Sequence, residues 1–157
     1  MCDILREIYK ETNQSDFNYE NMEDRIALQK TVYLLMNMGV YVGDYSFEWD
    51  KYGPYSFTLD VDAFKYGGQI HEEVCFSETA LEKMRRIVEY IQEGCEKFSD
   101  YSKRYWLESI ASMHYLKYVL RVEENKLLSE LQVRKEYLSS SEANERALQI
   151  AEEIENG

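Results

Sequence analysis

Residues 25–62 read RIALQKTVYLLMNMGVYVGDYSFEWDKYGPYSFTLDVD and include the only proline of the chain, Pro54. The stretch begins with apolar residues on too many faces for a surface helix, which predicts a buried central helix from about Arg25 to Met38. Gly39 follows as a C-terminal stop. Two polar residues before the helix are candidate N-caps, Asn21 and Asp24.

A short strand and a turn are predicted after the central helix. Three aromatic residues, Tyr45, Phe47 and Trp49, alternate with polar ones, which is the period of a strand. The proline fixes its own φ and disfavours helical backbone at Gly53, so residues 52–56 (YGPYS) predict a turn packed with rings.

Helical spacing of apolar residues recurs along the rest of the chain. Thr79, with Glu82 three residues later, matches a capping box, and the helix it opens is predicted to stop at Gly94. A second strand is predicted at residues 69–76. Further helices are predicted at about residues 3–12, from Ser56 or Thr58 to Phe64, and at 102–121, 123–138 and 141–155. Ser102 is expected to open the first of the last three, and the serines at 139–141 to cap the last.

These elements predict a mainly α fold: a compact helical domain with a small β element of two to three strands. The order helix, strand, helix, strand, helix is also compatible with a winged-helix-like arrangement. A length of 157 residues suits one domain. We expect residues 1–20 to form an N-terminal helix and loop, residues 21–100 to hold the central helix, aromatic strand, turn and capping-box helix, and residues 101–157 to form C-terminal helices.

Composition favours a packed globular protein in the cytoplasm. Hydrophobic residues make up 45% of the chain, but no run approaches the roughly eighteen apolar residues of a membrane span. The N-terminus lacks the features of a signal peptide. The three cysteines, Cys2, Cys75 and Cys95, are far apart and odd in number, so we expect reduced thiols. Cys75 lies between Val74 and Phe76, which favours a buried thiol.

The chain is strongly acidic, with a formal net charge of −12. Residues 1–24 carry seven acidic and two basic side chains, whereas residues 25–70 carry five acidic and four basic side chains. An acidic surface repels a phosphate backbone, so direct nucleic-acid binding is disfavoured. A protein partner that is basic, or that itself binds nucleic acid, is easier to accommodate.

The sequence contains no catalytic signature. A phosphate-binding loop, a dinucleotide fingerprint and a hydrolase nucleophile elbow are all missing. His71 and His114 have no cysteine or carboxylate at metal-ligand spacing. We interpret His114 as a hydrogen-bonded core residue and His71 as part of a solvated turn. The expectation is a protein that is not an enzyme and that holds no cofactor or metal.

Fourteen tyrosines make the chain rich in side chains that suit protein interfaces. Gln29 and Lys30, near the start of the central helix, could hydrogen-bond carbonyls of the predicted turn. The motif therefore has two interpretations: it locks the strand onto the helix, or it forms a binding surface. The candidate protein-interaction residues are Trp49, Tyr52, Tyr55, Gln29 and Lys30.

Two alternative functions remain open at this point. A winged-helix regulator that binds nucleic acid would require four basic residues to cluster: Arg85, Arg86, Lys103 and Arg104. An acidic inhibitor that mimics nucleic acid would require carboxylates in a regular surface array.

Residues 28–35 (LQKTVYLL), Gly39, Phe47-x-Trp49 and residues 52–56 with Leu59 and Asp60 form a combined pattern. The pattern resembles that of the YwgA-like family and, more distantly, the Panacea domain of SocA-like antitoxins. Residues 107–116 (LESIASMHYL) also resemble the later helix of the YwgA-like family. The resemblance implies a small helical, non-enzymatic domain of bacterial and phage-related defence systems, whose relatives act as antitoxins, protease adaptors or accessory subunits. This chain differs from DNA-binding antitoxins in having no basic tail.

Our leading hypothesis is therefore a protein-interaction module. It would act as an antitoxin-like or accessory subunit of a toxin–antitoxin or ATPase-containing antiviral defence system. Its partner would be a larger protein encoded nearby, such as a toxin, an ATPase or a nuclease subunit, held in a hetero-complex or oligomer.

Overall fold

The computed structural model describes residues 2–65 and 74–157, with the backbone alone at residues 2 and 3. Over these residues the protein is mainly helical (68%), with seven α-helices and one small antiparallel hairpin, which confirms the predicted fold class. No helix in this part of the chain has the length and apolar character needed to cross a membrane.

In chain order the elements are α1 (Cys2–Asn13), α2 (Met22–Asn37), β1 (Glu48–Asp50), β2 (Gly53–Tyr55), α3 (Phe57–Lys65), α4 (Glu78–Lys97), α5 (Lys103–His114), a π-helical turn η1 (Tyr115–Val119), a 3₁₀ turn η2 (Glu124–Lys126), α6 (Leu127–Arg134) and α7 (Ser141–Asn156).

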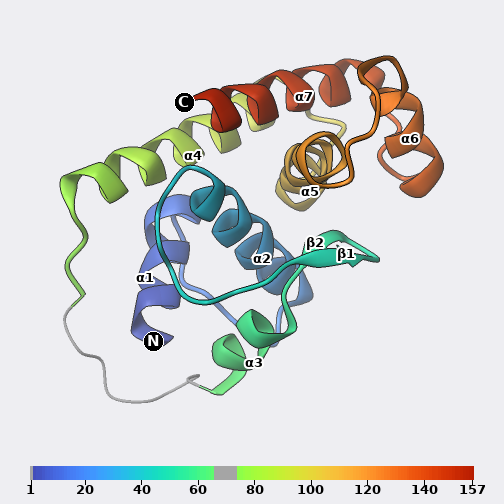
Figure 1. The fold of residues 1–157 in the computed structure, drawn as a ribbon. Helices are drawn as coiled ribbons and strands as arrows, with labels where there is room; N and C mark the ends of the chain where they lie inside the picture. The colour runs from blue at the N-terminus through green and yellow to red at the C-terminus, as the bar shows by residue number, and fades with distance from the viewer. Residues whose placement is uncertain (1, 66–73) are drawn as a thin grey trace.

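Helices α2 and α5 form the centre of the fold. They pack against each other, α7 covers α5, and α1 lies against α4 (Figure 1). The hairpin contacts both central helices, and α3 lies below it in the view of Figure 1. Every residue of α2 from Ile26 to Leu35 is buried, as its all-round apolar pattern predicts.

The boundaries of α2 follow its capping residues. Asn21 is the N-cap, and its side chain accepts a hydrogen bond from the Glu23 backbone N–H at 2.9 Å. The helix therefore begins at Met22, three residues earlier than predicted. Gly39 follows the C-cap with φ of 90°, a left-handed conformation that glycine adopts without steric cost.

The Gly-Pro pair lies in a strand, so its assignment to the turn was wrong. Gly53–Tyr55 is β2, and Lys51 and Tyr52 form the two-residue turn that joins it to β1. Trp49 faces Pro54, one position beyond the pair that closes the turn. Antiparallel pairs alternate between bonded and non-bonded, so this register places Pro54 where its missing N–H removes no hydrogen bond between the strands.

Helix α4 differs from its prediction at both ends. Its N-cap is Ser77, whose hydroxyl accepts from the Ala80 N–H at 3.1 Å, and not Thr79. It also continues past Gly94 to Lys97. Gly94 lies against Trp106 so closely that an added Cβ would overlap the indole ring. This glycine therefore allows two helices to approach each other and does not end one.

The C-terminal helices were predicted in the right order, with one too long. Residues 123–138 hold the 3₁₀ turn η2 and then α6, and the backbone leaves the helix at Lys135, whose side chain turns towards the hairpin. Ser102 and Ser140 cap α5 and α7 with their side chains, as expected. The π turn η1 extends α5 to the predicted end of the long helix.

Two expectations concern residues 69–76. The predicted strand lies mostly outside the described residues, and residues 74–77 form no strand. Cys75 is exposed, which contradicts the buried thiol predicted from its apolar neighbours. Two flanking apolar residues are therefore too short a pattern to show burial.

Candidate functional site

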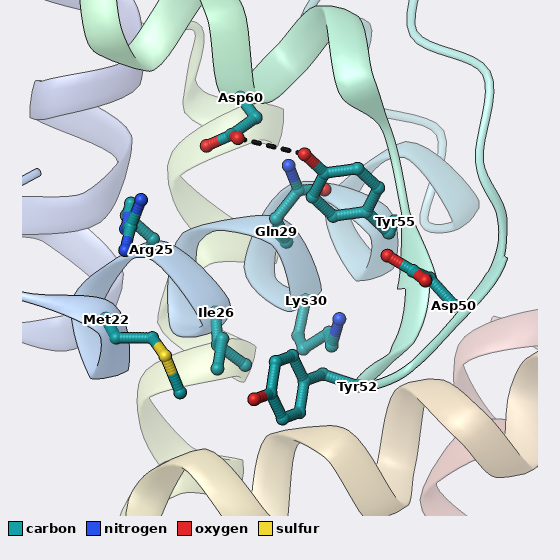
Figure 2. A pocket seen from close by; sticks show the side chains of 9 residues that line it. All are labelled: Met22, Arg25, Ile26, Gln29, Lys30, Asp50, Tyr52, Tyr55 and Asp60. Atoms are coloured by element: carbon teal, nitrogen blue, oxygen red, sulfur yellow. Dashed lines mark hydrogen bonds between the residues drawn. The ribbon is translucent and has the colours of Figure 1, made fainter.

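An open pocket of about 220 Å³ lies where α2, the hairpin and α3 meet. Figure 2 shows its lining side chains arranged around one hollow, with a dashed hydrogen bond at the top between Tyr55 and Asp60. The lining residues are Met22, Arg25, Ile26, Gln29, Lys30, Asp50, Tyr52, Tyr55 and Asp60.

Gln29 joins the end of the hairpin to the central helix. Its side-chain Nε2 donates to the Ser56 carbonyl at 2.9 Å, and its Oε1 accepts from the Ser56 backbone N–H at 2.9 Å. The amide thus satisfies both backbone groups of one buried residue, as a neighbouring strand would. This pair of bonds fixes the point at which β2 passes into α3.

Lys30 makes the second attachment. Its Nζ donates to the Pro54 carbonyl at 2.8 Å, and the residue is only 1% exposed. Desolvation lowers the pKa of Lys30 to about 7, partly opposed by the carboxylates of Glu108 and Asp50. The prediction that Gln29 and Lys30 hydrogen-bond this segment is confirmed, although their carbonyl partners lie in and after a strand.

A buried carboxylate lies beneath the hairpin. Glu108, fully buried on α5, accepts from Arg104 Nε at 3.1 Å and from the Tyr137 hydroxyl at 2.7 Å. Burial raises the pKa of Glu108, against the effect of these two donors and of the Lys30 charge. Glu108 therefore supplies negative charge to a region that holds several buried cations.

Lys135 attaches the turn of the hairpin from the other side. Its Nζ donates to the carbonyls of Asp50 and Lys51, and lies 4.9 Å from the centre of the Trp49 ring. Burial lowers the pKa of Lys135 to about 8. Together with Lys30 it anchors both strands of the hairpin to residues far away in the sequence.

Gly53 lets the hairpin approach α5 closely. Its φ is 92°, and an added Cβ would lie 2.6 Å from the Ser112 hydroxyl. Among the described residues that hydroxyl is buried without a hydrogen-bond partner. Both the backbone conformation and the space therefore require glycine here.

Two tyrosines form the walls of the pocket. The Tyr55 hydroxyl donates to Asp60 Oδ2 at 2.9 Å, and burial followed by this bond raises the pKa of Tyr55 to about 12. The guanidinium of Arg104 lies 4.6 Å from the centre of the Tyr52 ring, and Lys51 Nζ lies 5.4 Å from it. Both rings are thus held in place while still lining the hollow.

Four of the five predicted interaction residues come together in this pocket, and Trp49 does not. Its ring packs on Tyr115 with a centroid distance of 5.8 Å. Sequence reasoning missed five of the lining residues, Met22, Arg25, Ile26, Asp50 and Asp60. Helical spacing from Gln29 could have found the three on α2. The two aspartates, Asp50 and Asp60, join the pocket lining only once the hairpin has folded.

His114 is a buried, hydrogen-bonded core residue, as predicted. Hydrogen bonds of 2.8 Å join its Nδ1 to the Tyr33 hydroxyl and its Nε2 to Glu155 Oε2. Burial lowers its pKa, although Glu155 acts in the opposite direction. His71 lies outside the described residues. Within the described chain, no group of histidine, cysteine and acidic residues could hold a metal ion.

The basic residues named for nucleic-acid binding have different neighbours. Arg86 donates to the Tyr90 hydroxyl on α4, and Arg85 is exposed on the same helix. Lys103 donates to the Tyr9 hydroxyl at 3.3 Å, and burial lowers its pKa. Arg104 is paired with Glu23 and Glu108. Three of the four cations, Arg86, Lys103 and Arg104, are therefore already engaged in contacts within the fold.

No family model, no curated protein and no solved structure matches the chain. The resemblance to the YwgA-like and Panacea domains therefore stays a prediction from the sequence motifs.

Proposed function

We propose that this protein is a non-enzymatic protein-interaction module that uses the pocket between α2, the hairpin and α3. By the resemblance of its motifs, it would serve as an antitoxin-like or accessory subunit of a bacterial or phage defence system, bound to a larger protein encoded nearby.

One observation carries this proposal: the pocket is open, yet three of the polar side chains that line it already have hydrogen-bond partners within the fold. Gln29 and Lys30 are occupied by backbone groups of the hairpin, and Tyr55 is bonded to Asp60. A catalytic site needs a base or nucleophile within reach of substrate, whereas a binding site needs rigid walls. Tyrosine walls that are fixed in this way are suited to receiving a side chain of another protein.

The proposal is tested by substituting Tyr55 with alanine and co-purifying the protein with the products of its neighbouring genes. We expect Tyr55→Ala to fold but to bind the partner at least about tenfold more weakly, which corresponds to about 1.4 kcal/mol. Tyr41→Ala is the matched control, because Tyr41 is 75% exposed and its hydroxyl also bonds a nearby aspartate, Asp44. Circular dichroism and thermal unfolding report on the fold.

A second variant keeps the test decisive if Tyr55→Ala unfolds. Met22 lines the pocket and is 41% exposed, so Met22→Ser should leave the fold intact. Loss of the partner with folded Met22→Ser supports the proposal. Recovery of the natural protein only as a monomer, with no co-purifying partner, contradicts it.

A further inference from the structure

A row of exposed aromatic side chains on α3 adjoins the pocket. Phe57 and Phe64 are 72% and 65% exposed. They are seven residues apart and so lie on the same side of the helix, with Asp60 between them. Asp60 lines the pocket, so this side of α3 continues into the pocket wall.

The far end of the row also leads back to the pocket. The ring of Phe64 packs on Tyr19 with a centroid distance of 5.2 Å. The guanidinium of Arg25 lies 4.8 Å from the centre of the Tyr19 ring, and Arg25 lines the pocket. We refer to Tyr19, Phe57 and Phe64 as the aromatic ridge. Large exposed apolar side chains that gather beside a hollow are typical of an interaction surface.

The segments that frame the pocket and the ridge are acidic. Residues 16–30 and 48–64 together contain eight acidic and three basic side chains. Arg25 lies over the Tyr19 ring and Lys51 over the Tyr52 ring, and Lys30 is buried against the Pro54 carbonyl. The surface thus combines apolar rings with an excess of negative charge.

Two polar groups of residues that line the pocket have no hydrogen-bond partner among the described residues. The Nε of Arg25 is one, but it is buried from solvent. Asp50 is exposed at the pocket edge, and no described side chain donates a hydrogen bond to its carboxylate. The pocket therefore offers one carboxylate for a cation.

We propose that the pocket and the aromatic ridge together bind a basic, amphipathic segment of a partner protein. The apolar side chains of that segment pack on Phe57 and Phe64. A lysine or arginine side chain enters the pocket between Tyr52 and Tyr55 and reaches the carboxylate of Asp50. The inference rests on the interaction function proposed above and adds to it the chemistry of the partner.

The size and charge of the site favour this occupant over others. A pocket of about 220 Å³ holds one long side chain, and tyrosine faces attract cations. A second copy of this chain would bring acidic segments against acidic segments, which costs free energy. A phosphate backbone would meet the same repulsion.

The test uses the full chain and designed peptide probes. The first probe is an amphipathic helix of about 18 residues, with leucine and phenylalanine on one face and arginine on the other. One control peptide replaces arginine with glutamate, and a second replaces the apolar face with serine. By calorimetry, we expect the arginine peptide to bind at least about tenfold more tightly than either control, and more weakly as salt is raised.

Surface variants locate the binding. Phe57→Ser and Asp50→Asn should each weaken binding of the arginine peptide several-fold, because one removes apolar area and the other a charge. Val133→Ser and Glu145→Gln are the matched controls, since Val133 is 76% exposed on α6 and Glu145 is exposed on α7. Equal binding of the arginine and glutamate peptides, or an equal loss in Val133→Ser, overturns the inference.

The outcome also separates this inference from the proposed function. A natural partner that depends on Tyr55 but not on Phe57 or Asp50 overturns the basic-segment inference and leaves the interaction function in place. If the chain binds the arginine peptide at this site but binds no product of its neighbouring genes, only the assignment to a defence complex is overturned.

Discussion

Two buried polar networks hold distant parts of the chain together, and they differ in charge. The network under the hairpin contains ionisable groups, among them Lys30, Glu108 and Lys135. The network at the start of α7 is neutral and centres on Asn144. Both join residues that are far apart in the sequence, but only the charged network contains lysines whose pKa burial lowers to about 7 and about 8.

The neutral network fixes the start of α7. Asn144 Oδ1 accepts from the hydroxyls of Tyr101 and Ser109, each at 2.8 Å, and its Nδ2 donates to the Leu138 carbonyl at 3.0 Å. The Ser140 N–H donates to the Tyr101 hydroxyl at 3.1 Å. No charge is desolvated in this arrangement, so its contribution to stability does not depend on protonation.

The charged network attaches the hairpin at an electrostatic cost. Desolvation lowers the pKa of Lys30 and of Lys135 and raises that of Glu108, so burial disfavours the charged form of each group. The comparison teaches that a neutral amide is sufficient to position a helix. A buried lysine instead ties the attachment of the hairpin to pH.

The largest effect is expected from removing the negative charge of the charged network. Glu108→Gln leaves Lys30 and Arg104 without their shared carboxylate. We expect a loss of about 3–5 kcal/mol in the free energy of unfolding, measured by urea denaturation at pH 6, below the Lys30 pKa of about 7, because an uncompensated buried charge remains. A loss below about 1 kcal/mol at pH 6 would mean that Lys30 is neutral in the folded protein.

A smaller loss is expected in the neutral network. Asn144→Ala removes the acceptor of two buried hydroxyls and the donor to Leu138, but leaves no charge unpaired. We expect a loss of about 2–3 kcal/mol by the same measurement, unchanged between pH 6 and pH 9. Ser141→Ala, at an exposed position of the same helix, is the control.

The smallest effect is a pH dependence that belongs to the charged network. The pKa of Lys30 is about 7 in the folded protein and near its ordinary value of 10.5 when unfolded, so the unfolded chain binds more protons between these values. Stability should therefore rise as pH increases from 7 to 9, by about 2 kcal/mol from Lys30 alone, and Lys135 acts in the same direction.

Lys30→Met isolates that contribution. The groups facing Lys30 are Glu108, Lys135, Asp50 and Arg104, and all remain in the variant. We expect the rise in stability between pH 7 and pH 9 to be reduced, while Asn144→Ala retains it. An unchanged slope in Lys30→Met would assign the pH dependence to other groups.

Sequence reasoning correctly predicted the features that a short-range sequence pattern determines. All-round apolar character identified α2 as buried, and serine residues at helix starts marked α5 and α7. Gln29 and Lys30 were expected to bond the segment around Pro54, and they do. The first two features depend on residues within one element, whereas the bonds of Gln29 and Lys30 span 27 and 24 residues and were expected from their polar side chains near the proline segment.

The misses required information from distant residues. Gly94 was taken for a helix end because its partner, Trp106, comes from another helix. Glu108 and Lys135 gave no local sign that they support the hairpin, since they lie far along the chain from Asp50. The pocket likewise exists only after the hairpin has been placed against α2, so its full lining could not be predicted.

The anchoring of the hairpin also has a consequence for folding kinetics. Each strand has three residues, and so short a hairpin is not stable by itself. Its attachments come from α2, α5 and the residue after α6, so it gains them only when these helices have assembled. We expect the hairpin to form after the rate-limiting step of folding. Gly53→Ala should therefore accelerate unfolding while leaving the folding rate nearly unchanged, which stopped-flow measurements can determine.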